Sequence, residues 1–201
     1  MGEAGRAGKA VGTVSERLIG ELGIAEGDAW TDELAARVAG AVEEDKAIRD
    51  AMARLNRRAL SRRDLDRKLR ERGHEAVARA AALDRLTELG LIDDAAYGAA
   101  LADEVVRRKA AGPRLVEQKL RAKGVSGDVA GRIARDAAGD KDAQRAAARA
   151  AAEKKLGTMR GVDRATQRRR LYGLLGRRGF DSEVIAEVMD AVLNAADEGE
   201  A

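Results

Sequence analysis

The sequence predicts an all-α protein, a tandem array of three three-helix modules that forms an elongated, curved molecule after a short helical N-terminal segment. A nine-residue segment occurs three times, at residues 65–73, 116–124 and 171–179, with apolar residues four apart, a cation and a closing glycine. The closing glycines are 51 and 55 residues apart, about the length of three short helices with their turns. Only one proline and four aromatic residues occur among 201 residues, and alanine, leucine, arginine and glutamate abound, which favours helix.

Glycines, the single proline and helix-capping residues indicate where each module begins and ends. We expect an acidic N-terminal helical segment at 1–46, repeats at 47–93, 94–139 and 140–195, and an acidic tail at 196–201. In an array of this kind, neighbouring modules are expected to bury surface that a single module cannot.

The N-terminal segment and first repeat can be divided by their caps. Residues 1–12 have the composition of a disordered start, a short helix is expected to end near Leu22, and Thr31 is expected to begin the next one. In the first repeat a separate helix is expected over 47–60. Ser61 to Asp64 form a capping box for the second helix, which Gly73 stops in a left-handed conformation. A third helix is expected from Glu75 to Leu89, with an inner face made of Val77, Ala80, Leu83 and Leu86.

The second repeat follows the same plan. Asp93 and Asp94 can cap its first helix, and the apolar side chains predict an inner face of Tyr97, Leu101 and Val105. Gly112-Pro113 ends that helix and begins the next, because proline suits a first helical turn. Ser126 or Asp128 is expected to cap the closing helix, which carries Val129 and Ile133.

The third repeat follows the same plan, but its helices are spaced less regularly than those of the first two repeats. Asp140 is expected to cap a helix that reaches Leu156, and Asp163 caps the second helix. Asp181 or Ser182 caps the last helix, whose apolar face comprises Val184, Ile185, Val188, Met189 and Val192. The chain is expected to fray from about residue 195 onward.

The charge is unevenly distributed. Residues 1–46 hold 5 Lys/Arg against 10 Asp/Glu and residues 181–201 hold none against 7, which leaves a net charge of +15 for residues 47–180. Charged helices are often merely solvated on their outer faces. An imbalance sustained over so long a stretch instead favours a polyanionic partner, either nucleic acid or an acidic protein groove.

A helical wheel places many of these cations on one face. With Leu65 and Leu69 inward, Arg63, Arg67 and Arg70 point outward; the equivalent positions are Arg114, Gln118 and Arg121, then Arg169, Gly173 and Gly176. The stripe therefore weakens from the first repeat to the third, as expected of a binding surface centred on the first two. The candidate binding residues on or beside this stripe are Arg62, Arg63, Arg67, Lys68, Arg70, Arg107, Arg108, Arg114, Lys119, Arg121, Arg168, Arg169 and Arg170.

A second tier of cations lies close to the stopping glycines. Cations in a last turn also satisfy free carbonyl groups and the helix dipole, so a local structural role competes with a binding role here. The second-tier residues are Arg72, Lys123, Arg177 and Arg178.

From about Thr13 to Leu193, the sequence resembles the RecX family, bacterial regulators of the RecA recombinase. The resemblance rests on the order and spacing of several short stretches. They are Ala-Leu-Ser-Arg-Arg at 59–63, Lys-Leu-Arg-Glu-Arg-Gly at 68–73, Leu-Gly-Leu-Ile-Asp-Asp at 89–94 followed by Tyr97, Gly-Pro at 112–113, and Lys-Leu-Arg-Ala-Lys-Gly-Val at 119–125.

This resemblance implies a curved array of three-helix modules that lies in the groove of the RecA–DNA filament and inhibits the ATPase, recombinase and strand-exchange activities of RecA. Such a protein would modulate DNA repair, recombination and the SOS response. The expected partners are RecA, preferably as nucleoprotein filament, and single- or double-stranded DNA. We expect a monomer. Sequence-specific reading of DNA is not expected, because electrostatic contacts carry little base specificity.

Two alternatives remain open. The modules could form a direct, sequence-nonspecific DNA-binding protein of helix-turn-helix type, or a helical scaffold for an acidic protein. The outward stripe of the first repeat has no asparagine or glutamine with which to read adenine, and the second has only Gln118.

Catalysis is not predicted. The chain has no cysteine, and its only histidine, His74, follows a helix-stopping glycine, so a turn position is expected rather than a catalytic or metal-binding role. We expect no enzyme activity, no cofactor and no metal. The four aromatic residues, Trp30, Tyr97, Tyr172 and Phe180, are expected in the core rather than in base stacking. No apolar run is long enough to cross a membrane, and a cytoplasmic location is expected.

Overall fold

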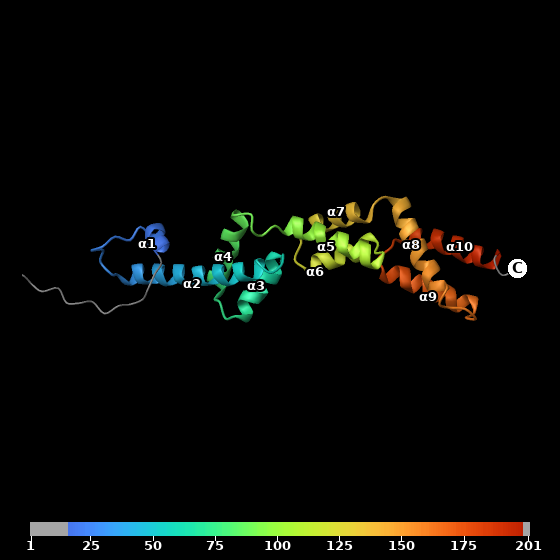
Figure 1. The fold of residues 1–201 in the computed structure, drawn as a ribbon, viewed down its shortest axis with the longest axis horizontal. Coiled ribbons are helices and arrows are strands. Elements are labelled where there is room, and N and C mark those ends of the chain that lie inside the picture. Colours follow the sequence, from blue (N-terminus) through green and yellow to red (C-terminus); the bar gives the residue numbers. More distant parts are fainter. Residues whose placement is uncertain (1–15, 199–201) are drawn as a thin grey trace, which may run out of the picture.

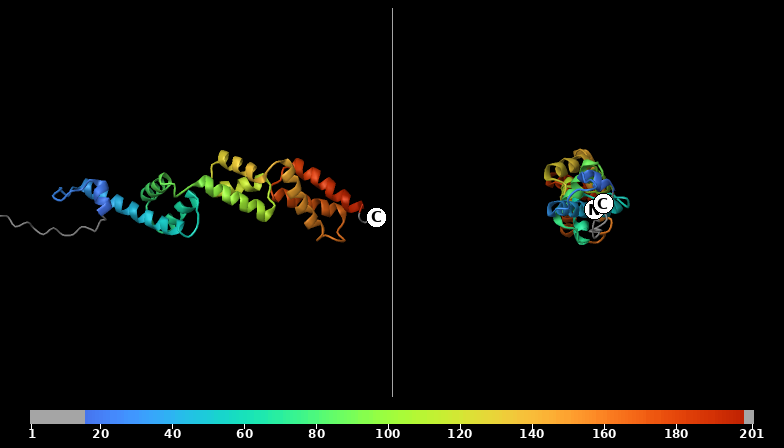
Figure 2. Two further views of the ribbon diagram at one scale, coloured as in Figure 1. Left: turned by 45° about the horizontal axis from the view of Figure 1, so that its top comes forward. Right: turned by 90° about the vertical axis from the view of Figure 1, so that its left-hand side faces the viewer.

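The computed structural model describes residues 16–198, and side chains as far as residue 195. Ten α-helices and no strand occur in this described part. The helices follow one another along a single long axis, so the molecule is elongated (Figures 1 and 2). The predicted all-α tandem architecture is confirmed. The predicted disordered start at 1–12 and the last residues of the acidic tail lie outside the described residues.

The N-terminal segment is continuous with the first module. Helix α1 spans Glu16–Leu22, and α2 spans Asp32–Leu55 without interruption. The backbone N–H of Leu34 donates to the hydroxyl of Thr31, which caps α2 as predicted. The separate helix expected over 47–60 is wrong: no glycine or proline interrupts residues 41–55, and nothing stops α2 there. The C-terminal half of α2 is thus the first helix of the first module.

The first module is completed by α3 (Arg62–Glu71) and α4 (Ala76–Glu88). The backbone N–H of Asp64 donates to the hydroxyl of Ser61 at 3.2 Å, so the predicted cap is present. The predicted inner face of α4 is wrong at Val77, which is 83% exposed, and at Ala80, which is also exposed; the buried side chains here are Ala78 and Ala82. The core consists of Ala51, Leu60, Leu65, Leu69, Leu83, Leu86 and Ile92.

The second module comprises α5 (Asp94–Lys109), α6 (Pro113–Ala122) and α7 (Gly127–Ala138). Asp93 caps α5, because its carboxylate accepts hydrogen bonds from two backbone N–H groups. The predicted side-chain cap of α7 is not formed, although Ser126 occupies the position before this helix. The core consists of Ala102, Val105, Ala111, Val116, Leu120, Val125, Ala130 and Ala134.

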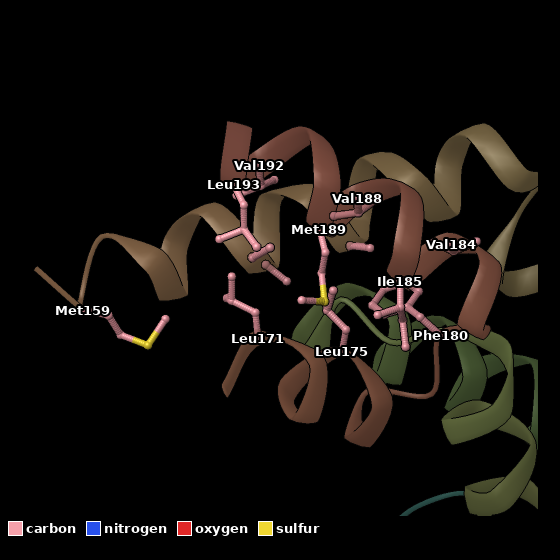
Figure 3. Close-up of a cluster of buried hydrophobic side chains, with 13 residues drawn as sticks. Met159, Leu171, Leu175, Phe180, Val184, Ile185, Val188, Met189, Val192 and Leu193 are labelled. Carbon is pink, nitrogen blue, oxygen red and sulfur yellow. The ribbon is translucent and has the colours of Figure 1, made fainter. Parts of the chain in front are cut away.

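The third module comprises α8 (Lys141–Leu156), α9 (Arg164–Arg177) and α10 (Ser182–Glu198). Asp140 and Asp163 cap α8 and α9 as predicted. Helix α10 continues beyond the expected fraying point at residue 195. Its apolar face packs onto α9 and α8, and side chains from α9 and α10 interdigitate (Figure 3). The core here includes Ala148, Ala152, Met159, Leu171, Leu175, Phe180, Val184, Ile185, Val188, Met189, Val192 and Leu193.

Each module has its own hydrophobic core. The buried apolar residues form three clusters, one per module, rather than one continuous core. Ala110, at the end of α5, packs against the core of the third module. Each module therefore encloses its own apolar centre, and the expectation that neighbouring modules also bury surface that a single module cannot stays a prediction.

The modules are joined through the second helix of each. The stopping glycine after α6, Gly124, lies against Arg63 near the start of α3, and a Cβ at this glycine would lie 2.7 Å from the Arg63 Cβ. In the same way Gly179, after α9, lies against the backbone of Leu115 near the start of α6. The backbone N–H of Gly112 also donates to the carbonyl of Arg178 at 2.8 Å. Helices α3, α6 and α9 therefore form one column along the molecule.

The aromatic residues differ from expectation. Phe180 is buried and Tyr97 is half-buried, but Trp30 is 52% and Tyr172 is 56% exposed. The core prediction is therefore wrong for Trp30 and Tyr172. Trp30 precedes the cap of α2, and Tyr172 follows the buried Leu171 by one residue, which turns it away from the core.

Candidate polyanion-binding face

The predicted stripe lies on the outer side of the helix column. Leu65 and Leu69 of α3, and Val116 and Leu120 of α6, are fully buried. Because these residues fix the rotation of both helices, the opposite positions face solvent. All six outward side chains of the first two modules are exposed: Arg63, Arg67, Arg70, Arg114, Gln118 and Arg121.

Several of these cations form ion pairs on the surface. Arg121 lies 2.7 Å from Glu117, and Arg114 lies 2.9 Å from Asp181 of the next module. Exposed pairs of this kind contribute little free energy, so their arginines can exchange partners at small cost. The other candidates in ion pairs are Arg62 with Asp84, Arg67 with Asp64 and Glu71, Arg108 with Glu104, and Arg168 with Asp190.

Other candidates form no ion pair with any residue in the described part of the chain. Their charge is balanced mainly by solvent, so a polyanion could neutralise it without displacing an internal partner. These residues are Arg63, Lys68, Arg70, Arg107, Lys119, Arg169 and Arg170. Arg63 has an additional role, because its guanidinium donates to the carbonyl of Arg121 across the module boundary.

A group of cations at the end of α2 is not among the predicted binding residues. Arg54, Arg57 and Arg58 line a surface hollow of about 500 Å³ together with Lys68 of α3 and Arg72 directly after it. A helix over 47–60 would have placed all three arginines on one face, because they are three and four positions apart, but their closeness to α3 depends on tertiary packing. The adjacent Arg57 and Arg58 were the available signal.

Asp50 is the single carboxylate in this cationic hollow. The ring Nε2 of His74 lies 2.9 Å from its Oδ2, and the Arg72 guanidinium lies 3.4 Å away. These two hydrogen bonds, the first above all, lower the pKa of Asp50 to about 2. His74 occupies the turn between α3 and α4 as predicted, and it also ties that turn to α2.

Two of the four second-tier side chains, those of Lys123 and Arg72, form ion pairs within the molecule. Lys123 Nζ lies 2.7 Å from the buried Asp64 carboxylate, which connects the second module to the first. Arg72 pairs with Asp50, and the Arg178 carbonyl accepts a bond from Gly112. These contacts favour a structural role, and the predicted binding role of Arg72, Lys123, Arg177 and Arg178 stays a prediction.

The face loses charge in the third module. Helix α9 begins at Arg164, about one turn earlier relative to its stopping glycine than α3 and α6 do. Gly173 and Gly176 hold the outward positions that carry cations in the first module. The exposed Arg168, Arg169 and Arg170 lie further toward the start of α9.

We also searched the described residues for groups of metal ligands and for membrane-spanning helices. Between residues 16 and 198, no three His, Asp or Glu side chains are grouped as metal ligands. No described helix is both long and apolar enough to span a membrane.

Comparison with known proteins gives a consistent result. Residues 93–132 match the model of the second three-helix domain of RecX, and residues 142–189 match that of the third. The chain is 30% identical over 155 residues to the regulatory protein RecX of Pelodictyon phaeoclathratiforme, covering 77% of this chain and 94% of that protein. It is 33% identical to the one from Chlorobaculum tepidum, covering 75% and 91%.

Solved structures support the same fold. A crystal structure of a regulatory protein RecX superposes with a TM-score of 0.79 at 22% identity, covering 88% of this chain and 86% of that one. RecX from Lactobacillus salivarius superposes with a TM-score of 0.64 at 20% identity, covering 76% and 97%.

Proposed function

Because this chain belongs to the RecX family of regulatory proteins, we propose that it binds the groove of the RecA–DNA filament through its basic face and inhibits RecA without catalysing a reaction. The activities inhibited would be the ATPase, the recombinase and strand exchange. The proposal includes a monomer that acts in the cytoplasm during DNA repair and the SOS response, with the repeats at 47–93, 94–139 and 140–195 as its modules.

The observation that carries the proposal is the column of second helices. Contacts at Gly124 join the end of α6 to the start of α3, which supports the proposal that the exposed arginines of the two modules form one extended cationic face. A groove lined by DNA phosphates or protein carboxylates offers the complementary charge over a comparable length. Affinity from this source falls as salt rises and is insensitive to base sequence.

Charge reversal at two equivalent positions tests the proposal. Arg70 and Arg121 occupy the same place in α3 and α6, and both are exposed. We expect Arg70→Glu with Arg121→Glu to weaken inhibition of the DNA-dependent RecA ATPase by about tenfold or more, because each reversal replaces attraction with repulsion. Arg63 is left unchanged, since it also supports the module boundary. The measurement is a titration of RecA ATPase with each variant.

A matched control carries the same change in charge on the third helices. Arg85 of α4 and Arg132 of α7 are exposed, and neither forms an ion pair with another described residue. Arg85→Glu with Arg132→Glu should inhibit within about twofold of the unaltered chain. Equal loss in both double variants would show that net charge matters and the face does not.

The alternative of a direct DNA-binding protein rests on the same exposed arginines, which could contact phosphates of naked DNA. It predicts equal affinity for unrelated DNA sequences, and no gain in affinity when RecA coats the DNA. Co-sedimentation with RecA–DNA filaments, compared with binding to the same DNA alone, separates the two functions.

A further inference from the structure

An apolar groove lies where the first module meets the second. It has a volume of about 490 Å³ and runs between the end of α2, the turn after α4 and the first half of α5. Leu91 is 46% exposed at this groove, and Tyr97 is half-buried. The larger apolar side chains that line it are Leu55, Leu60, Leu91, Tyr97 and Leu101.

Two cationic hollows share lining residues with the groove. Leu60 lines both the groove and the hollow that contains Arg57, Arg58 and Lys68. Leu101 and Glu104 are shared with a second hollow of about 310 Å³, which is also lined by Arg108, Lys109, Lys119 and Lys123. The groove is therefore apolar, and the hollows next to it are rich in cations.

The two carboxylates in the apolar groove are already engaged. Asp93 accepts backbone hydrogen bonds at the start of α5, and Glu104 lies 3.0 Å from Arg108. Neither carboxylate therefore favours a basic ligand. The charge that remains for a ligand is positive.

We infer that this groove binds a protein segment in which one or two large apolar side chains are flanked by carboxylates. A nucleic acid backbone could satisfy the cations but would leave the apolar side chains without a partner. A protein segment of this composition satisfies both. The inference rests on the proposed function, in that the segment would belong to the RecA subunits of the filament. The groove then supplies the preference for a protein-coated filament that cations alone cannot give.

A single substitution separates the two contributions. Leu91→Ser removes an exposed apolar side chain without altering charge, and we expect affinity for RecA–DNA filaments to fall about tenfold. Affinity for the same naked DNA should stay within twofold. Val77→Ser, at an exposed valine on α4, is the matched control and should leave both affinities unchanged. Co-sedimentation and DNA anisotropy give the two affinities, and circular dichroism checks that each variant is folded.

Cross-linking from a single position can identify the occupant of the groove. The chain has no cysteine of its own, so an introduced cysteine carries the probe at that position alone. A benzophenone attached to Leu91→Cys should cross-link to RecA polypeptide in filaments, with a yield at least fivefold above that of the same probe on Val77→Cys. Cross-links to DNA, to a second copy or within the chain would overturn the inference, as would equal yields at the two positions. If one of these outcomes overturns the inference about the groove while the unaltered chain still co-sediments with filaments, the proposed function stays intact. If the unaltered chain does not co-sediment, the proposed function fails first.

Discussion

At the scale of the residue, Asp50 connects α2 to the end of α3 and the turn that follows. Its pKa is lowered from 3.8 to about 2, chiefly by the hydrogen bond with His74 and then by Arg72. Because the folded-state pKa is lower than the unfolded one, this carboxylate stabilises the fold above pH 4. That contribution is lost as the pH falls from about 4 to 2.

We therefore expect Asp50→Asn to lower the free energy of unfolding by about 1–2 kcal/mol at pH 7 and to change it little at pH 2. Urea unfolding between pH 2 and 7 measures the difference. Asp84→Asn is the control, because Asp84 is well exposed and its pair with Arg62 is worth little. A loss that is the same at every pH would contradict the assignment.

At the scale of the element, one glycine fixes how the third module docks. Gly179 has a φ of 81°, where a side chain costs about 1–2 kcal/mol, and a Cβ would also collide with the backbone of Leu115. Gly179→Ala should therefore lower the free energy of unfolding by at least about 2 kcal/mol. Thermal and urea unfolding check this value. A change below 0.5 kcal/mol would show that α9 can shift away from α6.

The same helix contains a glycine with the opposite expectation. Gly176 lies inside α9, and a Cβ there would meet nothing within 4 Å. Gly176→Ala should raise the free energy of unfolding by about 0.5–1 kcal/mol, because alanine loses less backbone entropy in a helix. The same unfolding measurements apply. Destabilisation would indicate that this position packs against a neighbour.

Local signals predicted most elements, and one helix boundary was predicted where no such signal exists. Caps at Thr31, Ser61, Asp93, Asp140 and Asp163 are each confirmed by a side chain that accepts a backbone hydrogen bond. Such caps depend on three or four successive residues and are visible in a sequence. The continuity of α2 was missed because two helices were assigned to one uninterrupted run without a stop signal between them.

The candidate binding face was also predicted where a local pattern suffices and missed where tertiary contacts are needed. The outward stripe on α3 and α6 follows from helical periodicity alone, since the buried leucines fix the rotation. The cations at the end of α2 meet Lys68 and Arg72 only because α2 and α3 fold together. The apolar groove likewise combines residues of α2 and α5 that are about 40 positions apart. Contacts of this kind depend on tertiary packing, which no local pattern specifies.

At the scale of the whole molecule, the two module boundaries differ in chemistry. Besides the ion pair of Arg114 with Asp181, the second and third modules share two backbone hydrogen bonds, which Gly112 and Arg114 donate to the turn at Gly179. The first and second modules are joined instead through side chains: Lys123 with Asp64, and Arg62 N–H with Asp94 at 2.8 Å. Since each module has a separate core, these contacts determine how firmly the array holds its shape.

Salt should therefore loosen the first boundary more than the second. Screening at 1 M salt acts over about 3 Å, compared with about 10 Å at 0.1 M, and weakens partly exposed ion pairs more than backbone hydrogen bonds. Spin labels on Val77→Cys and Arg132→Cys should give a broader distance distribution at 1 M salt, whereas labels on Arg132→Cys and Asn194→Cys should not. Lys123→Gln should broaden the first distribution already at 0.1 M, because it leaves Asp64 without that partner. Equal broadening at both boundaries would mean that the backbone bonds at Gly179 do not hold the second boundary, and that the array is flexible throughout.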